Sequence, residues 1–562
     1  MRRATVAERS AVPVLVLVTL FVLVVVPILM VVYTAFRDAV PFSGSESNFT
    51  LSNFGALFEE KTVSAAINTV IVTIGGTLMA TAIGCILAWL AARTDIPFKP
   101  LVHVVGILPL FISMLAATVT WALLGAGNSA YLNIILADLG APFRIEMRSL
   151  AGFIFVEGLY HVPYPFLLVY AALSLITSDI EEAAAVHGAN QFQTTMKIIF
   201  PVVLPAILGS MILNAVMMVE NIAVPQILGG PVGLETLSIR VYYLMNRIPS
   251  SPTQASAVAL LLAAIVFALI YAQNFVLKGR DYRTISGKGA QQKVMSLGNW
   301  RYVAAGFVVL YFTVAIVLPM LALLLGALRA NAYIANTAAM FDVAQLSSDR
   351  LLSITSDSEV INGLKNSLVV AFVTCVFGTG FFFILAYIVH RTRIPGRKVI
   401  EYIAMMPLAI PATLLAMGVL WAWIGSPIPV YGTIYIIILS FLPRFMPQAF
   451  RALSSSVMQV HEDLENAALL CGATRAQTVW KVFLPLVRGG VVSAAFLLFV
   501  LSLREVGGAL FLYTTNTRVL SIVVFESYEN GSWDFVAGVS LLYTVLLGGI
   551  TLLGLKWLRP SL

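Results

Sequence analysis

Three charged residues interrupt long apolar stretches of this sequence. Glu220 lies within the run MMVENIAVPQILGG, and Arg504 and Glu505 are adjacent in the run LSLREVGGALFLY. An ionisable group is costly to bury in an apolar environment, so its presence there is by default a functional hypothesis. The pattern predicts that Glu220, Arg504 and Glu505 line the path of a cationic substrate. The alternative is a structural role, either a hydrogen bond or, for Glu505, an ion pair with Arg504.

A second polar pair, Glu157 and His161, is spaced by four residues and therefore shares one helix face. A structural contact is the favoured interpretation, because two residues are too few for a stable metal site. No phosphate-binding G-x-x-x-x-G-K-[ST] motif is present, so any nucleotide must bind a partner subunit. We therefore expect this chain to hold no catalytic residue and no cofactor. Three widely separated cysteines give neither a disulfide framework nor metal-ligand spacing: Cys85, Cys375 and Cys471.

The amino-acid composition indicates the environment in which these residues lie. Of 562 residues, 59% are hydrophobic and 11% are charged, and the mean hydropathy is +0.93. Soluble proteins average about 45–50% apolar and about 25% charged residues. These values exclude a water-soluble, disordered or nucleic-acid-binding protein. They predict an all-α protein that crosses a membrane many times.

Twelve apolar stretches approach or exceed the roughly 20 residues that a spanning helix needs. The first is too long for the core of a signal peptide, and no small-x-small cleavage site follows it, so we expect a retained anchor. The stretches are 12–36, 64–92, 101–125, 149–175, 202–225, 254–277, 302–328, 361–389, 399–424, 431–450, 487–513 and 535–558.

The formal net charge of +7 has a topological explanation. If the amino terminus lies inside, most Lys and Arg residues fall on the inner side, with clusters at 2–9, 278–301 and 391–398. This is the positive-inside bias of membrane proteins. It predicts a multi-pass protein with both termini in the cytoplasm and no nucleic-acid partner, and it says nothing about the substrate.

An internal repeat divides the chain. Residues 68–97 align with 366–395 at an offset of 298, with ten of thirty positions identical. Residues 179–205 align with 463–489 at an offset of 284, with eleven of twenty-seven identical. Six spans per half return the chain to its starting side, so the halves are expected to be parallel repeats about an axis along the membrane normal. The predicted domains are a first half, 1–277, an inner linker, 278–300, and a second half, 301–562.

Two inner loops repeat a short acidic pattern. The first, 179–205, reads DIEEAAAVHGANQFQTTMKIIFPVVLP, and the second, 463–487, reads DLENAALLCGATRAQTVWKVFLPLV. Carboxylates suit the start of a helix, small residues permit close approach, and glycine breaks the backbone. Two interfacial amphipathic helices would also explain the composition. Because the pattern recurs at matching inner positions, we favour two copies of a docking surface.

The pattern Glu182-Ala183-Ala184-x3-Gly188-x9-Ile198-x-Phe200-Pro201 resembles the EAA loop of permease subunits of binding-protein-dependent ABC importers. The second copy is similar, with Asn466 in place of Glu182 and an acidic residue one position earlier. The resemblance implies a type I importer pseudodimer, in which each loop forms a coupling helix on a cytoplasmic ATPase. The implied coupling residues are Glu181, Glu182, Ala183, Ala184, Gly188, Glu465, Ala467, Ala468 and Gly472.

The same resemblance implies the partners. They are a cytoplasmic ABC ATPase dimer that binds ATP and Mg, an extracytoplasmic solute-binding protein, and the lipid bilayer of a bacterial inner membrane. The Arg-Thr-x-Ile-Pro loop and the Leu-Arg-Glu stretch look like the ferric-iron branch, and a hard cation favours oxygen ligands such as Glu220 and Glu505. Thiamine, polyamine and phosphonate importers have similar permeases and stay open as alternatives. A rival from another class is an ion-coupled secondary transporter with parallel repeats.

Overall fold

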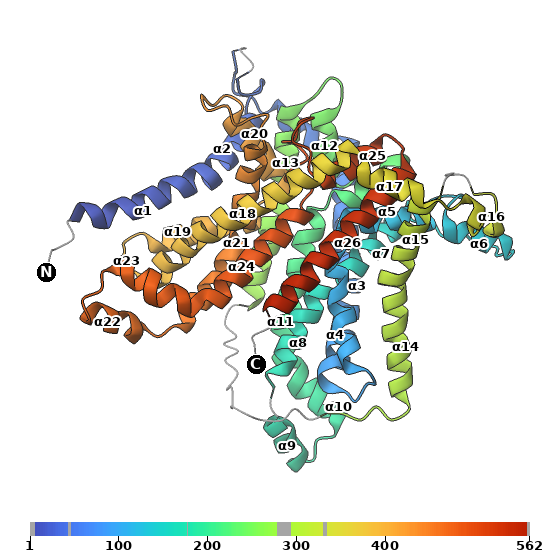
Figure 1. Cartoon of the computed structure of the whole chain (residues 1–562), viewed down its shortest axis with the longest axis horizontal. Helices are drawn as coiled ribbons and strands as arrows, with labels where there is room; N and C mark the ends of the chain where they lie inside the picture. Colours follow the sequence, from blue (N-terminus) through green and yellow to red (C-terminus); the bar gives the residue numbers. More distant parts are fainter. Residues whose placement is uncertain (1–5, 43–45, 177, 278–293, 330–333, 559–562) are drawn as a thin grey trace.

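The computed structural model describes residues 6–42, 46–176, 178–277, 294–329 and 334–558. Within these ranges the chain is helical, with no β-structure beyond three isolated bridges (Figure 1). Nine helices there are long and apolar enough to cross a membrane, and three bent helix pairs would each add one span. The predicted all-α architecture of about twelve spans is confirmed.

Three of the predicted spans are broken rather than straight. A proline lies at or shortly before each break, because it lacks an N–H and disfavours continuation of the preceding helix. Pro109 and Pro407 are the second residues of the 3₁₀ turns that precede the two sharp bends, and Pro163 is the first residue after the third break. The broken spans are α4 with η3 (Lys99–Phe111) and α5 (Met114–Gly125), bent by 96°; α7 (Leu150–Tyr160) and α8 (Pro163–Ser174), bent by 42°; and α19 with η9 (Arg397–Ala409) and α20 (Ala412–Trp423), bent by 113°.

The internal repeat is visible in the lengths of the helices. The long helices α3 (Glu60–Arg93) and α18 (Ser358–Arg391) each have 34 residues. The short helices of the acidic loops, α9 (Ser178–Val186) and α22 (Glu462–Leu470), each have nine. Near the far end, α12 (Leu237–Asn246) and α25 (Leu520–Glu529) have ten each, and α13 (Pro252–Leu277) and α26 (Trp533–Leu558) have 26. The fourth span of the second half is the continuous helix α21 (Ile434–Gln459).

Four π-helical turns occupy matching places in the two halves, and each is followed by a proline two residues later. A π turn relieves the clash between a proline ring and the carbonyl group of the preceding turn, so the helix continues. The turns are η1 (Phe21–Val25) before Pro27, η4 (Thr195–Ile199) before Pro201, η7 (Thr313–Val317) before Pro319 and η10 (Val479–Phe483) before Pro485.

The first span of each half packs on the other half. Helices α1 (Val6–Leu20) and α2 (Val26–Ala35) contact α19 and α20, while α14 (Trp300–Phe312) and α15 (Leu318–Leu328) contact α4 and α5 (Figure 1). The α2–α20 crossing is close: a Cβ at Gly418 would lie 2.2 Å from the carbonyl oxygen of Pro27. The two halves are therefore interlocked rather than simply adjacent.

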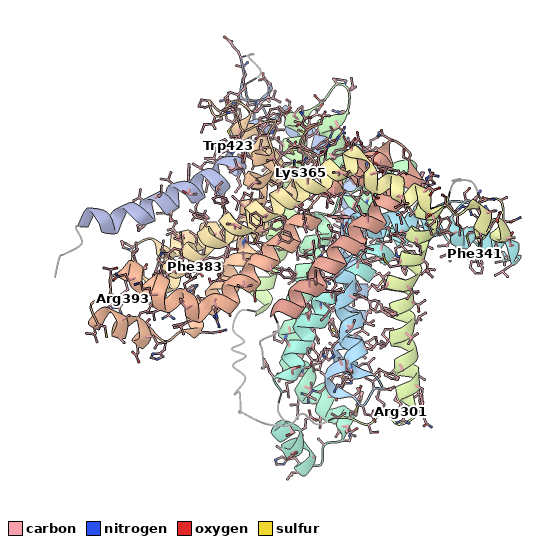
Figure 2. All side chains as sticks on the ribbon, viewed as in Figure 1. Arg301, Phe341, Lys365, Phe383, Arg393 and Trp423 are labelled. Carbon is pink, nitrogen blue, oxygen red and sulfur yellow. The ribbon has the colours of Figure 1, made fainter. Side chains whose placement is uncertain are left out.

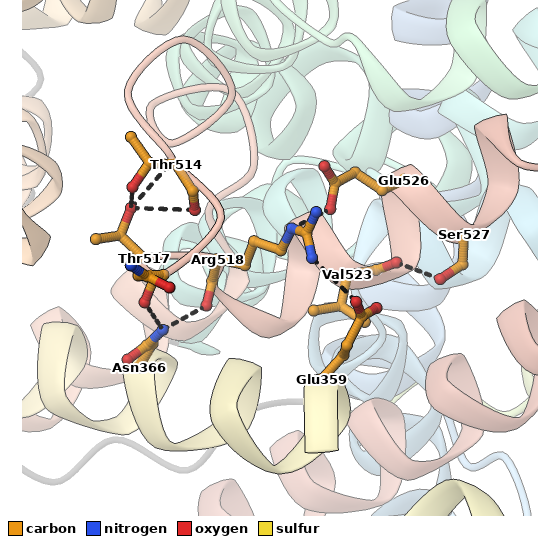
Figure 3. A network of polar contacts seen from close by, with 9 residues as sticks. Glu359, Asn366, Thr514, Thr517, Arg518, Val523, Glu526 and Ser527 are labelled. Atoms are coloured by element: carbon orange, nitrogen blue, oxygen red, sulfur yellow. Dashed lines mark hydrogen bonds and ion pairs between the residues drawn. The ribbon is translucent and has the colours of Figure 1, made fainter. Parts of the chain in front are cut away.

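The repeated asparagine at the start of the aligned segment ties each long helix to the loop before α12 or α25. Asn68 Nδ2 donates to the carbonyl oxygen of Glu235 at 3.0 Å. Asn366 Nδ2 donates to the carbonyl oxygen of Arg518 at 2.8 Å, and the Arg518 guanidinium lies between Glu359 and Glu526 (Figure 3). A side-chain amide that satisfies a distant backbone carbonyl explains why this residue is identical in both halves.

We expect Asn68→Ala to lower the free energy of unfolding by about 1–3 kcal/mol, because it leaves the Glu235 carbonyl without its donor. Thermal unfolding of the purified chain in detergent measures this. Asn246→Ala is the control, since its Nδ2 donates only to Tyr242 within the same helix. If Asn68→Ala were no less stable than Asn246→Ala, the hydrogen bond from Asn68 to Glu235 would not stabilise the loop before α12.

The predicted linker 278–300 falls largely outside the described residues, which resume at 294, so the boundaries of the halves stay predictions. Met295 N donates to the carbonyl oxygen of Arg93 at 2.8 Å, and Asp95 N donates to Met295 at 3.2 Å. The backbone N–H of Leu297 and the hydroxyl of Ser296 donate to the Asp95 carboxylate and hold its pKa below its usual value. The end of the linker is thus attached to the loop after α3.

Two arginines of the predicted inner clusters lie toward the acidic helices. Figure 2 shows Arg301 and Arg393 toward the ends that carry α9 and α22 in Figure 1. Lys365 and Trp423 lie at the opposite end. The orientation of the chain in the membrane stays a prediction.

Candidate functional site

The two acidic helices, α9 and α22, each turn one face to the protein and leave the other free. In α9, Ala184 is buried and Glu181 is half-buried, while Glu182, Ala183 and Gly188 are exposed. In α22 and the turn after it, Glu465 and Ala468 are half-buried, while Ala467 and Gly472 are exposed. The predicted coupling residues therefore divide into an anchoring face and an accessible face in both halves.

Both acidic helices end in the same glycine turn. Gly188 has a φ of +78° and Gly472 a φ of +86°, in the left-handed region that favours glycine. In each case the next N–H bonds back across the turn, from Ala189 to the Ala184 carbonyl and from Ala473 to the Ala468 carbonyl. This is a Schellman C-cap, which releases the chain toward the next helix.

A buried arginine anchors the first acidic helix. Arg93, the last residue of α3, is 2% exposed, and its Nη1 lies 2.5 Å from Glu181 Oε1. Its Nη2 donates to the carbonyl oxygens of Leu173 and Ile176 at 3.1 and 3.3 Å, at and just beyond the end of α8. One guanidinium thus joins α3, α8 and the acidic helix.

The second half repeats this arrangement. Arg391 Nη2 donates to the carbonyl oxygens of Val457 and Val460, and its Nε lies 3.5 Å from Glu465 Oε1. Tyr387 adds a hydroxyl that donates to the same carboxylate at 2.8 Å. Glu465 is therefore the counterpart of Glu181, and Asn466 replaces the exposed Glu182.

Each acidic loop continues into one long helix. Helices α10 (Gln191–Thr194), η4 and α11 (Phe200–Val219) form a single 29-residue span, and α23 (Arg475–Thr478), η10 and α24 (Leu484–Arg504) a 30-residue span. Pro201 lies within this continuous helix and not in the first turn of a new one. The helix begins at Gln191, with a capping box from Asn190, because the π turn accommodates the proline.

The far ends of these two long helices carry the predicted acidic residues. Glu220 directly follows α11 and Glu505 directly follows α24, so both lie at helix ends rather than within spans. Both meet Arg444 of α21: Glu220 forms an ion pair with it, and Glu505 Oε2 lies 3.7 Å from its Nε. The backbone N–H of Ala412, at the start of α20, also donates to Glu220 at 3.2 Å.

This cluster lines a cavity of about 170 Å³ between the two halves. The side chains of Glu220, Arg444 and Glu505 are 9%, 14% and 13% exposed. Arg504 lines the same cavity, but the ion pair of Glu505 is with Arg444 and not with its chain neighbour. Aromatic and polar residues complete the wall, including Tyr160, His161, Tyr164 and Asn221.

The repeat does not place the two glutamates at equivalent positions. Asn221 Oδ1 accepts from the N–H of Val224, three residues on, and Glu505 Oε1 accepts likewise from Gly508. A serine hydroxyl donates to the carbonyl oxygen of each, Ser238 to Asn221 and Ser521 to Glu505. The counterpart of Glu505 is therefore Asn221, which is also the residue that the sequence offset of 284 pairs with Glu505.

Glu157 and His161 lie in contact at the end of α7. His161 Nδ1 is 3.3 Å from Glu157 Oε2 and 2.9 Å from the Glu157 carbonyl oxygen. Both side chains are buried. Among the described residues no three His, Cys, Asp or Glu side chains are grouped closely enough to hold a metal ion. The pair supports the bend between α7 and α8.

Sequence reasoning missed the three arginines that organise these contacts. Arg93 and Arg391 belong to the repeated Arg-Thr-x-Ile-Pro run, and the repetition of a charge at the end of an apolar stretch was the available signal. Arg444 lies inside the predicted stretch 431–450, where the argument applied to Glu220 also holds. Its partners could not be identified from the sequence, because Glu220 and Glu505 follow two other spans.

Comparison with known proteins gives a family match in both halves. The family model described as "Binding-protein-dependent transport system inner membrane component" matches residues 80–278 and 378–561. Each match includes one acidic loop and one long helix that ends at the charged cluster.

Two individual relatives and one solved structure are each at most 26% identical to this chain. The ferric transport system permease protein FbpB of Actinobacillus pleuropneumoniae is 26% identical over 75% of this chain, and the aligned part spans 60% of that protein. The Fe(3+)-transport system permease protein FbpB 2 of Haemophilus influenzae is 24% identical over 89% of this chain and 91% of its own length. A solved bacterial ABC transporter that imports the polysaccharide alginate aligns with 46% of this chain and 95% of its own, at 18% identity and a TM-score of 0.38.

Proposed function

Because this chain belongs to the family of inner membrane components of binding-protein-dependent transport systems, we propose that it is the permease of an ATP-driven importer, with both half-permeases fused in one chain. The observation that carries the proposal is the repeated acidic helix, anchored by an arginine and exposed on its other face. A surface built twice in this way suits a partner that is itself a dimer.

The proposed mechanism follows the two long helices. An ATPase dimer would dock on the exposed faces of α9 and α22 and bind ATP and Mg, for which this chain has no phosphate-binding motif. Closure of the dimer would move both acidic helices. Arg93 and Arg391 would pass that movement to α3 and α18, and the continuous helices from Gln191 and Arg475 would pass it to the charged cluster, about 43 Å away at 1.5 Å per residue.

We propose that the substrate path includes the cavity between the halves, which Glu220, Arg504 and Glu505 line. Ferric iron is the favoured cargo, since carboxylates suit a hard cation and relatives named as ferric permeases align over most of this chain. Thiamine, polyamine and phosphonate stay as alternatives. An extracytoplasmic solute-binding protein would deliver the cargo. Both termini would face the cytoplasm of a bacterial inner membrane.

The rival is an ion-coupled secondary transporter, which needs no ATPase. Affinity purification of the full chain from its native membrane distinguishes the two. We expect a nucleotide-binding subunit to co-purify with the chain and to be lost when Val186 and Leu470 are both replaced by Glu, because these exposed apolar side chains lie on the acidic helices. Purification without any such subunit, under conditions that preserve uptake, would exclude the importer.

Bulky side chains at the two glycine turns test the coupling role. We expect Gly188→Val with Gly472→Val to reduce uptake at least tenfold while the chain remains folded. A Cβ at either position meets no atom within 4 Å, so the folding cost is limited to the left-handed backbone, about 1–2 kcal/mol each. Substrate uptake into vesicles and thermal unfolding measure the two effects.

Gly140→Val is the matched control for this pair. Gly140 also has a positive φ, +70°, and open space around a Cβ, but it lies far along the chain from either acidic loop. The control should have a similar folding cost and normal uptake. Equal loss of uptake in the control and in the double variant would assign the effect to backbone strain.

A further inference from the structure

Arg444 is the one cationic group that touches both predicted acidic residues in the described part of the chain. Its guanidinium pairs with Glu220 and lies 3.7 Å from Glu505. Glu220 comes from the first half of the repeat, and Arg444 and Glu505 come from the second. The contact therefore crosses the interface between the halves, and any separation of the halves must break or exchange it.

The exchange is constrained by charge. A buried carboxylate left without a positive partner is strongly unfavourable, because removing one member of a buried pair leaves an uncompensated charge. When the halves part, Glu220 and Glu505 therefore need a replacement for the guanidinium. A cation in the adjoining cavity of about 170 Å³ can supply that charge.

The cavity wall offers a further oxygen. The Tyr160 hydroxyl is buried at this wall, with 4% of the residue exposed, and lies close to the Trp121 side chain. Tyr160 is also the repeat counterpart of Arg444, at the offset of 284. One half thus presents a guanidinium and the other presents a phenol oxygen at the same cavity.

We propose that Arg444 takes the place of the cationic cargo between Glu220 and Glu505 when the transporter is empty. This proposal rests on the importer function proposed above and names the substrate class of its path. The site selects a multivalent, oxygen-seeking cation, since only such an ion can displace a guanidinium from two carboxylates. Monovalent Na⁺ and K⁺ do not displace Arg444, so the path does not leak them.

The test is binding of terbium(III), a luminescent trivalent cation that prefers oxygen ligands, to the full chain in lipid nanodiscs. Removing the competitor in Arg444→Gln is expected to tighten terbium binding at this site at least tenfold. Arg444→Lys keeps the charge but loses the planar guanidinium, so it should tighten terbium binding by about threefold. This variant replaces Arg444→Gln in the test if Arg444→Gln does not fold. Glu220→Gln with Glu505→Gln should remove the site, and this variant defines the background.

Arg247→Gln is the control, because it removes one positive charge from an exposed arginine outside this cavity, which bonds to Ser251 and Gln254. Its effect should be under threefold. Equal tightening by Arg247→Gln and Arg444→Gln would show a general charge effect and overturn the proposal, as would unchanged binding in Arg444→Gln. The binding assay needs no ATPase, so its failure is distinct from failure of the ATPase co-purification, which tests the importer function.

Discussion

Replacing Arg93 and Arg391 together by glutamine is expected to abolish substrate uptake while leaving the twelve-span body in the membrane. Each guanidinium holds one carboxylate and two backbone carbonyl groups at the base of an acidic helix. Losing one partner of a buried ion pair costs about 3–5 kcal/mol. That is enough to detach α9 and α22 from α3 and α18, because neither nine-residue helix is stable alone.

The measurement is uptake into vesicles that contain the complex, together with the amount of ATPase bound. Arg247→Gln is the control, since this arginine is exposed and bonds only to Ser251 and Gln254 beyond the end of α12. Arg93→Lys with Arg391→Lys should restore part of the uptake, because the charge remains. Normal uptake in the double glutamine variant would show that the anchored contact does not transmit movement.

The second large effect is expected from Glu220→Gln with Glu505→Gln. Uptake should fall at least tenfold, because the path loses both carboxylates. The variant should also be destabilised by about 3–5 kcal/mol, since Arg444 is left buried without a partner. Two causes therefore overlap in the double variant and must be separated.

Adding Arg444→Gln to this pair separates them. The triple variant has no unpaired charge among these three residues, so we expect thermal stability to recover toward the wild-type value. Uptake should remain lost, because the carboxylates are still absent. If the triple variant transported normally, Glu220 and Glu505 would be structural residues and the substrate path would lie elsewhere.

Much of this architecture was accessible from the sequence. Hydropathy indicated the spans, and two offsets, 298 and 284, indicated the repeat and located both acidic loops. These signals can be read from short stretches of sequence. A spanning helix makes all of its backbone hydrogen bonds within itself and must be apolar over its length. The positions of the breaks were harder to predict, since a proline can lie shortly before a bend, as Pro407 does, or after a π turn within a continuous helix, as Pro201 does.

The contacts within the candidate sites could not be predicted from the sequence. Arg93 and Glu181 are 88 residues apart, and Glu220 and Arg444 are 224 apart, so no sequence spacing relates them. The repeat itself could be followed up to this site. The offset of 284 pairs Glu505 with Asn221, and the turns after α11 and α24 agree, since each of these side chains accepts from the N–H three residues ahead.

The central claim is that this chain is the membrane component of an ATP-driven importer for a cation. Its most direct test is ATP hydrolysis by the chain reconstituted in liposomes with its co-purified ATPase and binding protein. We predict that binding protein loaded with ferric iron stimulates hydrolysis over the unloaded protein, and that stimulation is lost in the Arg93→Gln, Arg391→Gln variant. Cation uptake driven by an ion gradient, with no ATPase required and no response to the binding protein, would contradict the account.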